Sequence, residues 1–133
     1  PGESEEVCRG GAQYKFTMIP PKIDSYRFGR IVIDGQPHSK DVILMPDGVV
    51  PGWWRKEGHS LDPADLDAIQ ENKPRILVIG LGVFSRMQIP EVTRQWLEES
   101  GIELVALPSK DACKYYNQIR EQGDVAAAIH LTC

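Results

Sequence analysis

The chain has 133 residues, enough for one compact domain that buries about two thirds of its unfolded surface without a disulfide or a metal. Its hydrophobic fraction of 41% and charged fraction of 26% are ordinary for a globular protein, and no apolar run is long enough to span a bilayer. The lack of such a run argues against a membrane protein. The net charge is −4 and the basic residues never form a run of three, which argues against nucleic acids as partners.

The acidic segment 1–6 has neither the basic nor the apolar region of a secretory signal, so we expect a cytoplasmic location. Residues 1–11 are polar, and we expect them to form a flexible acidic tail within a single domain spanning 1–133. Cys8, Cys113 and Cys133 are odd in number and lack a CxxC pair. This spacing predicts reduced thiols and no metal site.

The front of the chain has the pattern of antiparallel strands. Residues 31–33 and 42–45 are rich in β-branched and aliphatic side chains, and the Asp34-Gly35 turn between them predicts a hairpin. After a second turn at 46–48, residues 49–55 resemble a short edge strand, because Pro51 cannot donate to a central ladder.

The first predicted helix begins at Asp62, a suitable N-cap, with Pro63 at the first helical position. Leu66 and Ile69 form its inward stripe, and the helix ends before Asn72. The apolar run 76–79, which ends in Gly80, is typical of a strand buried on both faces of a parallel sheet.

Two more helices follow, each between strands. Pro90 opens the first and Gly101 ends it, while Ser109 caps the second and Gly123 ends it. The residues expected to face the core are Val92, Trp96 and Leu97 in the first helix and Ala112, Tyr116 and Ile119 in the second. With strands at 102–107 and 125–131, this is a βαβαβ series. The fold class predicted is α/β, three-layer, with a mixed central sheet and an antiparallel N-terminal hairpin.

Several segments occur together in a recognisable order: Asp41-Val42-Ile43 with Pro46-Asp47-Gly48, Trp53-Trp54-Arg55-Lys56-Glu57-Gly58-His59, Val78-Ile79-Gly80-Leu81-Gly82, Tyr116-Asn117, and His130-Leu131-Thr132-Cys133. Their order and spacing resemble the domain-of-unknown-function family that includes the adipogenesis-associated vertebrate protein and, more distantly, a mitochondrial complex I assembly factor. The resemblance covers nearly everything after the acidic tail. It implies a three-layer fold and non-enzymatic assembly or regulatory roles, and it supplies no catalytic residue.

Gly80 and Gly82 follow a predicted buried strand, where glycines let backbone amides approach an anion closely. A dinucleotide fingerprint would continue to a third glycine, but Ser85 stands there and Pro90 delays the helix. A purely structural turn is therefore the favoured interpretation, with an anion site as its alternative.

Arg55, Glu57 and His59 alternate, so in an extended segment they would share one face. A guanidinium, a carboxylate and an imidazole together can bind an anion and transfer a proton. The competing interpretation is a solvated edge strand whose charges discourage pairing between chains, and we favour it because no nucleophile is evident.

His130 lies near the end of the last strand and, in a parallel arrangement, at the same sheet edge as Gly80, where open α/β sheets usually bind ligands. It is a candidate ligand contact, with a structural hydrogen bond as the alternative. Asn117 either reaches the glycine loop or bonds to nearby backbone.

Trp53 and Trp54 point to opposite sides of an extended chain, so one is expected to pack inward and the other to be exposed. An exposed indole is a frequent anchor for protein partners, whereas a second tryptophan covering the core is the alternative.

The leading hypothesis is a non-catalytic binding, adaptor or assembly domain without a cofactor, whose partner is another protein or a second copy of the chain. The alternative is an enzyme or sensor for a small anionic ligand, in which the Gly80–Gly82 amides act with His130 and Arg55.

Overall fold

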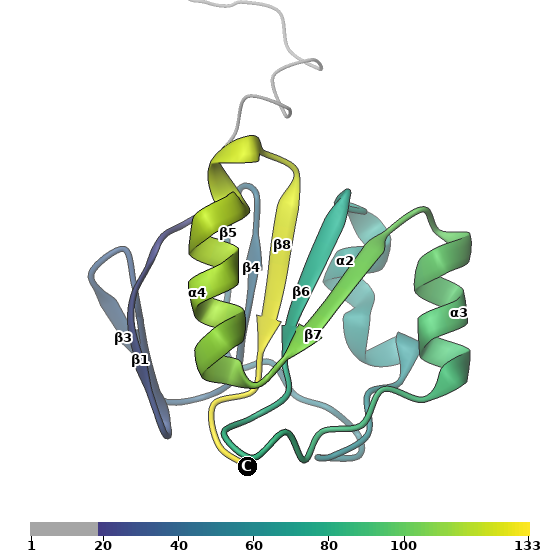
Figure 1. Cartoon of the computed structure of the whole chain (residues 1–133), viewed down its shortest axis with the longest axis horizontal. Coiled ribbons are helices and arrows are strands. Elements are labelled where there is room, and N and C mark those ends of the chain that lie inside the picture. Colours follow the sequence, from purple (N-terminus) through teal and green to yellow (C-terminus); the bar gives the residue numbers. More distant parts are fainter. Residues whose placement is uncertain (1–18) are drawn as a thin grey trace, which may run out of the picture.

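The computed structural model describes residues 19–133, so the expected tail at 1–11 and Cys8 lie outside the described residues. Within these residues the strands form a five-stranded and a three-stranded sheet (Figure 1). In spatial order the larger sheet contains β5 (Gly48–Val50), β4 (Val42–Met45), β8 (Val125–Ile129), β6 (Ile76–Gly80) and β7 (Glu103–Leu107). The smaller contains β1 (Ile23–Arg27), β2 (Arg30–Ile33) and β3 (Gln36–His38).

The larger sheet is mixed, which confirms the predicted fold class. β6 is parallel to both β7 and β8, whereas β4 is antiparallel to β5 and β8. The segment β6–α3–β7–α4–β8 is the expected βαβαβ series, in which α3 spans Glu91–Glu99 and α4 spans Ser109–Ile119. The edge position of β5 also agrees with the prediction, but the strand ends before Pro51 and does not extend over the predicted 49–55.

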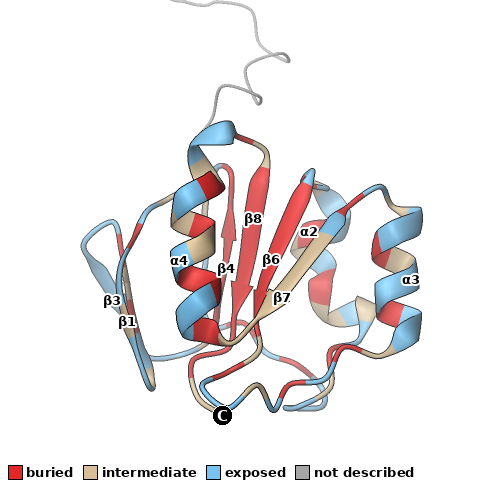
Figure 2. Ribbon diagram, in the orientation of Figure 1, coloured by how far each residue is buried: buried red, intermediate tan, exposed pale blue. Residues whose placement is uncertain are grey.

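Both faces of the central strands are covered, and β6 and β8 are buried along their whole length (Figure 2). Alternate residues of β8 serve the two faces: Val125, Ala127 and Ile129 pack with α4 and the three-stranded sheet, and Ala126 and Ala128 pack with the other helices. Those helices are the 3₁₀ turn η2 (Pro63–Leu66), α2 (Asp67–Glu71) and α3. A 3₁₀ turn η3 (Arg120–Gln122) follows α4.

The capping signals around the first helix are present as predicted. The Asp62 carboxylate accepts a hydrogen bond from Ala64 N, and the Asp65 carboxylate accepts one from Asp62 N. Leu66 and Ile69 are buried, and Gly101 takes the left-handed conformation with φ +77° after α3. No helix within residues 19–133 is long and apolar enough to cross a bilayer.

The predicted N-terminal hairpin was paired wrongly. The Asp34-Gly35 turn joins β2 to β3 inside the separate three-stranded sheet, with Ile33 opposite Gln36. The hairpin that extends the larger sheet is β4–β5, which turns at Pro46-Asp47. Local turn chemistry identified both turns, but the choice of partner strand depends on packing between distant segments.

Two side chains were also assigned wrongly. Val92 is 62% exposed, and Thr93 faces the core instead because its hydroxyl donates to the carbonyl of Leu61 at 2.7 Å. Ser109 does not cap α4: Pro108 stands at the N-cap, and the Ser109 hydroxyl bonds to other segments. Both errors arise because the hydroxyls of Thr93 and Ser109 form hydrogen bonds with segments that are distant in the sequence.

Candidate functional site

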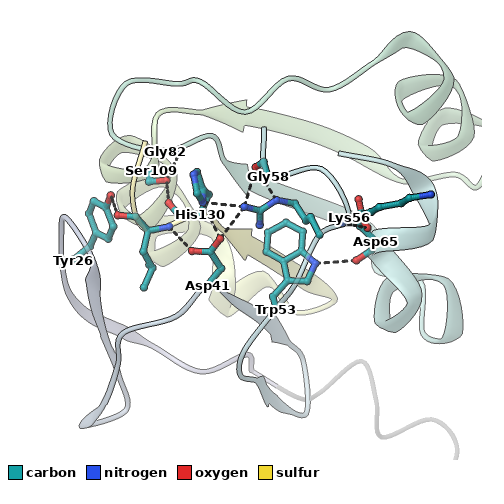
Figure 3. A network of polar contacts seen from close by, with 11 residues as sticks. Tyr26, Asp41, Trp53, Lys56, Gly58, Asp65, Gly82, Ser109 and His130 are labelled. Carbon is teal, nitrogen blue, oxygen red and sulfur yellow. Dashed lines mark hydrogen bonds and ion pairs between the residues drawn. The ribbon is translucent and has the colours of Figure 1, made fainter. Parts of the chain in front are cut away.

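A buried polar cluster lies at the sheet edge where the parallel strands end. Asp41 immediately precedes β4 and His130 immediately follows β8, and the antiparallel pairing of Val42 with Ile129 brings the two together. Asp41 Oδ2 lies 2.8 Å from His130 Nδ1 and 2.9 Å from Arg55 Nη2 (Figure 3). We call Asp41, Arg55 and His130 the polar cluster.

Hydrogen bonding fixes the orientation of each member of the polar cluster. Arg55 Nε and Nη2 both donate to the carbonyl of Gly58, and the guanidinium carbon lies 4.5 Å from the centroid of the Trp53 ring. Asp41 Oδ1 accepts from Leu131 N at 2.8 Å. The cluster therefore ties together the segments before β4, after β5 and after β8.

The contacts of His130 favour one tautomer. Nδ1 lies 3.1 Å from Arg55 Nη2, which is only a donor, and 2.8 Å from Asp41 Oδ2, which accepts when ionised. The shorter contact and the ionised carboxylate favour a proton on Nδ1. His130 Nε2 is then a buried acceptor; it and Arg55 Nη1 are the two buried side-chain atoms within residues 19–133 that lack a hydrogen-bond partner.

Opposing effects act on the carboxyl group of Asp41. Burial alone raises its pKa, but the hydrogen bonds from His130 and Leu131 N and the positive charge of Arg55 outweigh burial. The net pKa lies below the ordinary aspartate value of 3.8. Asp41 is therefore a carboxylate at neutral pH and balances the guanidinium charge.

Arg55, Glu57 and His59 do not share one face. Arg55 is buried, whereas Glu57 and His59 are exposed, because a turn with a Ser60 N to Glu57 O hydrogen bond interrupts the extended chain. The His59 ring nevertheless lies edge-on to the His130 ring, with centroids 6.0 Å apart. Of the predicted set, His59 and Arg55 thus flank His130, whereas Glu57 is exposed on the turn.

The amides of the glycine loop are engaged within the protein. Leu81 N donates to the carbonyl of Leu107, Gly82 N to Ser109 Oγ at 2.8 Å, and Val83 N to the carbonyl of Thr132 at 2.6 Å. Ser109 Oγ in turn donates to the carbonyl of His130. The chain itself therefore occupies the amides that the alternative anion site would need.

Gly82 is required for this close packing. Its φ is +101°, and a Cβ placed there would lie 2.2 Å from the carbonyl carbon of Cys133 and 2.9 Å from His130 Cδ2. At Gly80 a Cβ would lie 2.7 Å from Ser109 Oγ. Both glycines allow backbone segments to meet where a side chain would separate them.

Asn117 lies away from the glycine loop. Its Oδ1 accepts from Ile23 N at 3.1 Å and its Nδ2 donates to the carbonyl of Ile23 at 2.7 Å. Asn117 thus replaces a strand partner for β1 and fastens the three-stranded sheet to α4.

The adjacent tryptophans differ as predicted. Trp53 is buried, and its Nε1 donates to the carbonyl of Asp65 at 2.8 Å. Trp54 is 76% exposed. The backbone between them continues directly into Arg55, whose side chain returns to the interior.

Sequence reasoning missed the structural roles of Asp41 and Ser109. In the sequence, Asp41 was recognised only as part of a segment that carries the family resemblance. Its proximity to His130 follows from the antiparallel pairing of β4 with β8. A polar residue at the end of each of two apolar strands was the available signal. No local pattern marks Ser109, because its partners come from two other segments.

A model described as a protein of unknown function, DUF498/DUF598, matches residues 23–130. The chain belongs to this family. The match begins with β1 and ends at His130, so it includes all three members of the polar cluster.

Solved structures share the fold. A conserved hypothetical protein, PH1505 from Pyrococcus horikoshii OT3, is 25% identical with a TM-score of 0.72, over 84% of this chain and 99% of that one. The protein MT938 is 29% identical with a TM-score of 0.70, over 85% and 99%. A structure described as an outer membrane protein from Bartonella henselae is 23% identical with a TM-score of 0.73, over 88% and 99%, a likeness of fold alone.

The chemistry available to the polar cluster is that of a charge-balanced hydrogen-bonded network. Asp41 and Arg55 neutralise each other, and His130 Nε2 remains as an acceptor. Within residues 19–133 no group of three or more His, Cys, Asp or Glu side chains is placed to hold a metal ion.

Proposed function

We propose that this chain is a non-catalytic binding domain of the adaptor or assembly type, and that Trp54 anchors its protein partner. The observation that carries the proposal is the exposure of the Trp54 indole, 76%, on a backbone whose neighbours are fixed on both sides. Large aromatic side chains of this kind dominate the binding energy of many interfaces.

The fixed backbone matters because ordering a loop costs free energy on binding. Trp53 N donates to the carbonyl of Asp41 at 2.7 Å, and Lys56 N donates to Asp65 Oδ1 at 3.2 Å. Between them Arg55 is held by Gly58 and Asp41. The backbone that carries Trp54 is therefore already fixed, so that binding a partner would cost little conformational entropy in this segment.

The partner we propose is a protein with an apolar recess that admits an indole. The sequence resembles the family that includes the adipogenesis-associated vertebrate protein and, more distantly, the complex I assembly factor, and the assembly roles that this resemblance implies support the choice. The anionic-ligand alternative is less favoured, because it would break the hydrogen bonds of Leu81 N, Gly82 N and Val83 N.

Affinity capture with matched baits tests the proposal. The wild type, Trp54→Ala and Val92→Ala are immobilised at equal density, because Val92 is also a large apolar residue exposed on the surface. We expect a partner retained by the wild type and Val92→Ala, whose dissociation constant with purified protein rises at least tenfold for Trp54→Ala, about 1.4 kcal/mol or more.

The same samples separate self-association from binding to another protein. Sedimentation equilibrium of the wild type and Trp54→Ala reports whether a second copy occupies the tryptophan. If every captured protein is retained equally by Trp54→Ala, the proposed anchor is wrong.

A further inference from the structure

A pocket of about 490 Å³ lies beside the first turn of α4, apart from the polar cluster. Its lining comes from the end of β1 and the β1–β2 turn, the loop after β6 and the start of α4: Tyr26, Arg27, Phe28, Val83, Pro108, Lys110 and Asp111. Figure 1 shows α4 beginning at the lower edge of the sheet, on the side of the three-stranded sheet. This edge, where parallel strands end, is where open α/β sheets bind ligands.

The walls of the pocket are held in place by hydrogen bonds between segments. Gly29 N and the Tyr26 hydroxyl both donate to the carbonyl of Leu131, at 2.9 and 3.0 Å, which fixes the turn that carries Phe28. Val83 N donates to the carbonyl of Thr132 at 2.6 Å. Since two of the three lining segments are fastened to residues 131–132, and Ser109 N at the start of α4 donates to the carbonyl of Gly82, the pocket is preformed, and a ligand would not have to order it.

The lining combines an apolar surface with positive charge. Phe28 is 57% exposed, although a phenyl ring gains free energy when it leaves water, and Val83 and Pro108 continue the apolar wall. Arg27 and Lys110 contribute two cations, against the single carboxylate of Asp111 in the described lining. Pro108 stands at the N-cap of α4 and offers no capping side chain, so the positive end of the helix dipole adds to this charge.

We propose that this pocket binds a small amphipathic organic acid, a carboxylate with a medium-length alkyl or aromatic body. The body lies against Phe28, Val83 and Pro108, and the carboxylate lies between Lys110 and Arg27 at the start of α4. The pocket volume of about 490 Å³ favours a small molecule, because small-molecule sites range from about 300 to 1,000 Å³. A helix of a protein partner, about 10–12 Å across with its side chains, would be too wide for a pocket of this volume.

The amphipathic class follows from the pairing of the two surfaces. An inorganic anion would leave Phe28 in water, and an uncharged apolar molecule would gain nothing from Lys110 and Arg27. Trp54 is not part of this lining, so the proposed ligand site and the proposed protein-binding function can fail separately.

Titration with octanoate, followed by amide chemical shifts of the ¹⁵N-labelled protein, tests the proposal. We expect saturable shifts at Phe28, Val83 and Lys110. Lys110→Glu should raise the dissociation constant at least fivefold, and Phe28→Ala should also raise it. Lys114→Glu, an exposed lysine one turn further along α4 and outside the pocket, should change the constant less than twofold.

Two uncharged or truncated probes complete the test. Octan-1-ol removes the charge and acetate removes the body, and both should bind at least tenfold more weakly than octanoate. Unchanged thermal unfolding of Lys110→Glu shows that the fold is intact. Absence of saturable shifts with octanoate, equal binding of octan-1-ol, equal binding of acetate, or equal weakening by Lys114→Glu would each overturn the proposal.

Discussion

The interior and the rim of the same sheet edge use their side chains in opposite ways. In the interior, Asp41, Arg55, Ser109 and Gly82 direct their hydrogen bonds to other segments of the chain. On the rim, Trp54 and Phe28 expose large apolar surfaces from backbones that the interior holds fixed. Residues that hold this edge together are therefore not the ones free to bind, although the sequence places both kinds side by side.

Gly82→Val should break the interior most severely. The new side chain would overlap the backbone of Cys133 and occupy a φ of +101°, so we expect a loss of more than about 4 kcal/mol, or no folding at all. Gly35→Val is the matched control, because Gly35 has φ +81° and open space around it. It should cost about 2 kcal/mol from backbone strain alone. Urea unfolding followed by circular dichroism measures both, and equal losses would show that the close contact is unimportant.

The two tryptophans give the sharpest test of interior against rim. Trp53→Ala removes a buried indole, its bond to Asp65 and its packing on Arg55, so we expect a loss of about 3–5 kcal/mol. Trp54→Ala should change the free energy of unfolding by less than about 0.5 kcal/mol. The urea concentration at the midpoint of unfolding, compared at equal dependence of the free energy on urea, provides the measurement. A comparable loss of stability for both variants would contradict the distinction between a structural Trp53 and an exposed Trp54.

Asp41→Ala should cost about 2–3 kcal/mol, less than a fully buried ion pair, because the Asp41 side chain remains 14% exposed. The loss arises from leaving the Arg55 guanidinium buried without its carboxylate. Glu98→Ala, which removes an exposed carboxylate from α3, is the control and should be nearly neutral. If the two variants unfold at the same urea concentration, the polar cluster contributes nothing to stability.

Acid should weaken the interior through the same carboxylate. The pKa of Asp41 is lower in the folded chain than in the unfolded chain, so the unfolded state takes up the proton first as the pH falls. This contribution is present in full above the unfolded value, near 3.8, and is lost as the pH drops through the folded value. Unfolding free energies of the wild type and Asp41→Asn between neutral pH and pH 2 should therefore converge in acid. Parallel curves would exclude Asp41 as a source of this dependence.

The smallest effect concerns thiol reactivity and leaves stability untouched. Burial raises the pKa of Cys113 to about 12, so its thiolate is scarce at pH 8, whereas Cys133 is partly exposed. Iodoacetamide labelling, read by peptide mass spectrometry, should modify Cys133 at least a hundredfold faster than Cys113 in the folded protein. Urea should abolish the difference; fast labelling of Cys113 in the folded state would show that α4 opens readily.

Local sequence signals were sufficient wherever the decisive interactions are close along the chain. The Asp62 cap, the left-handed Gly101 and the buried run of β6 depend on neighbouring residues or on residue type, so the mixed three-layer fold was predictable. Period-two alternation also predicted that one of Trp53 and Trp54 packs inward and the other is exposed, but not which of the two.

Tertiary structure alone decided which strands pair and which polar groups meet. Nothing near Asp34-Gly35 shows that β2 pairs with β3 while β4 pairs with β8. The pairing of β4 with β8 creates the contact between Asp41 and His130, which are 89 positions apart. Ser109, which was expected to be a cap, instead bridges the loop after β6 and the segment after β8. The physical reason is that buried donors and acceptors must find partners wherever packing brings the chain together, irrespective of their distance along it.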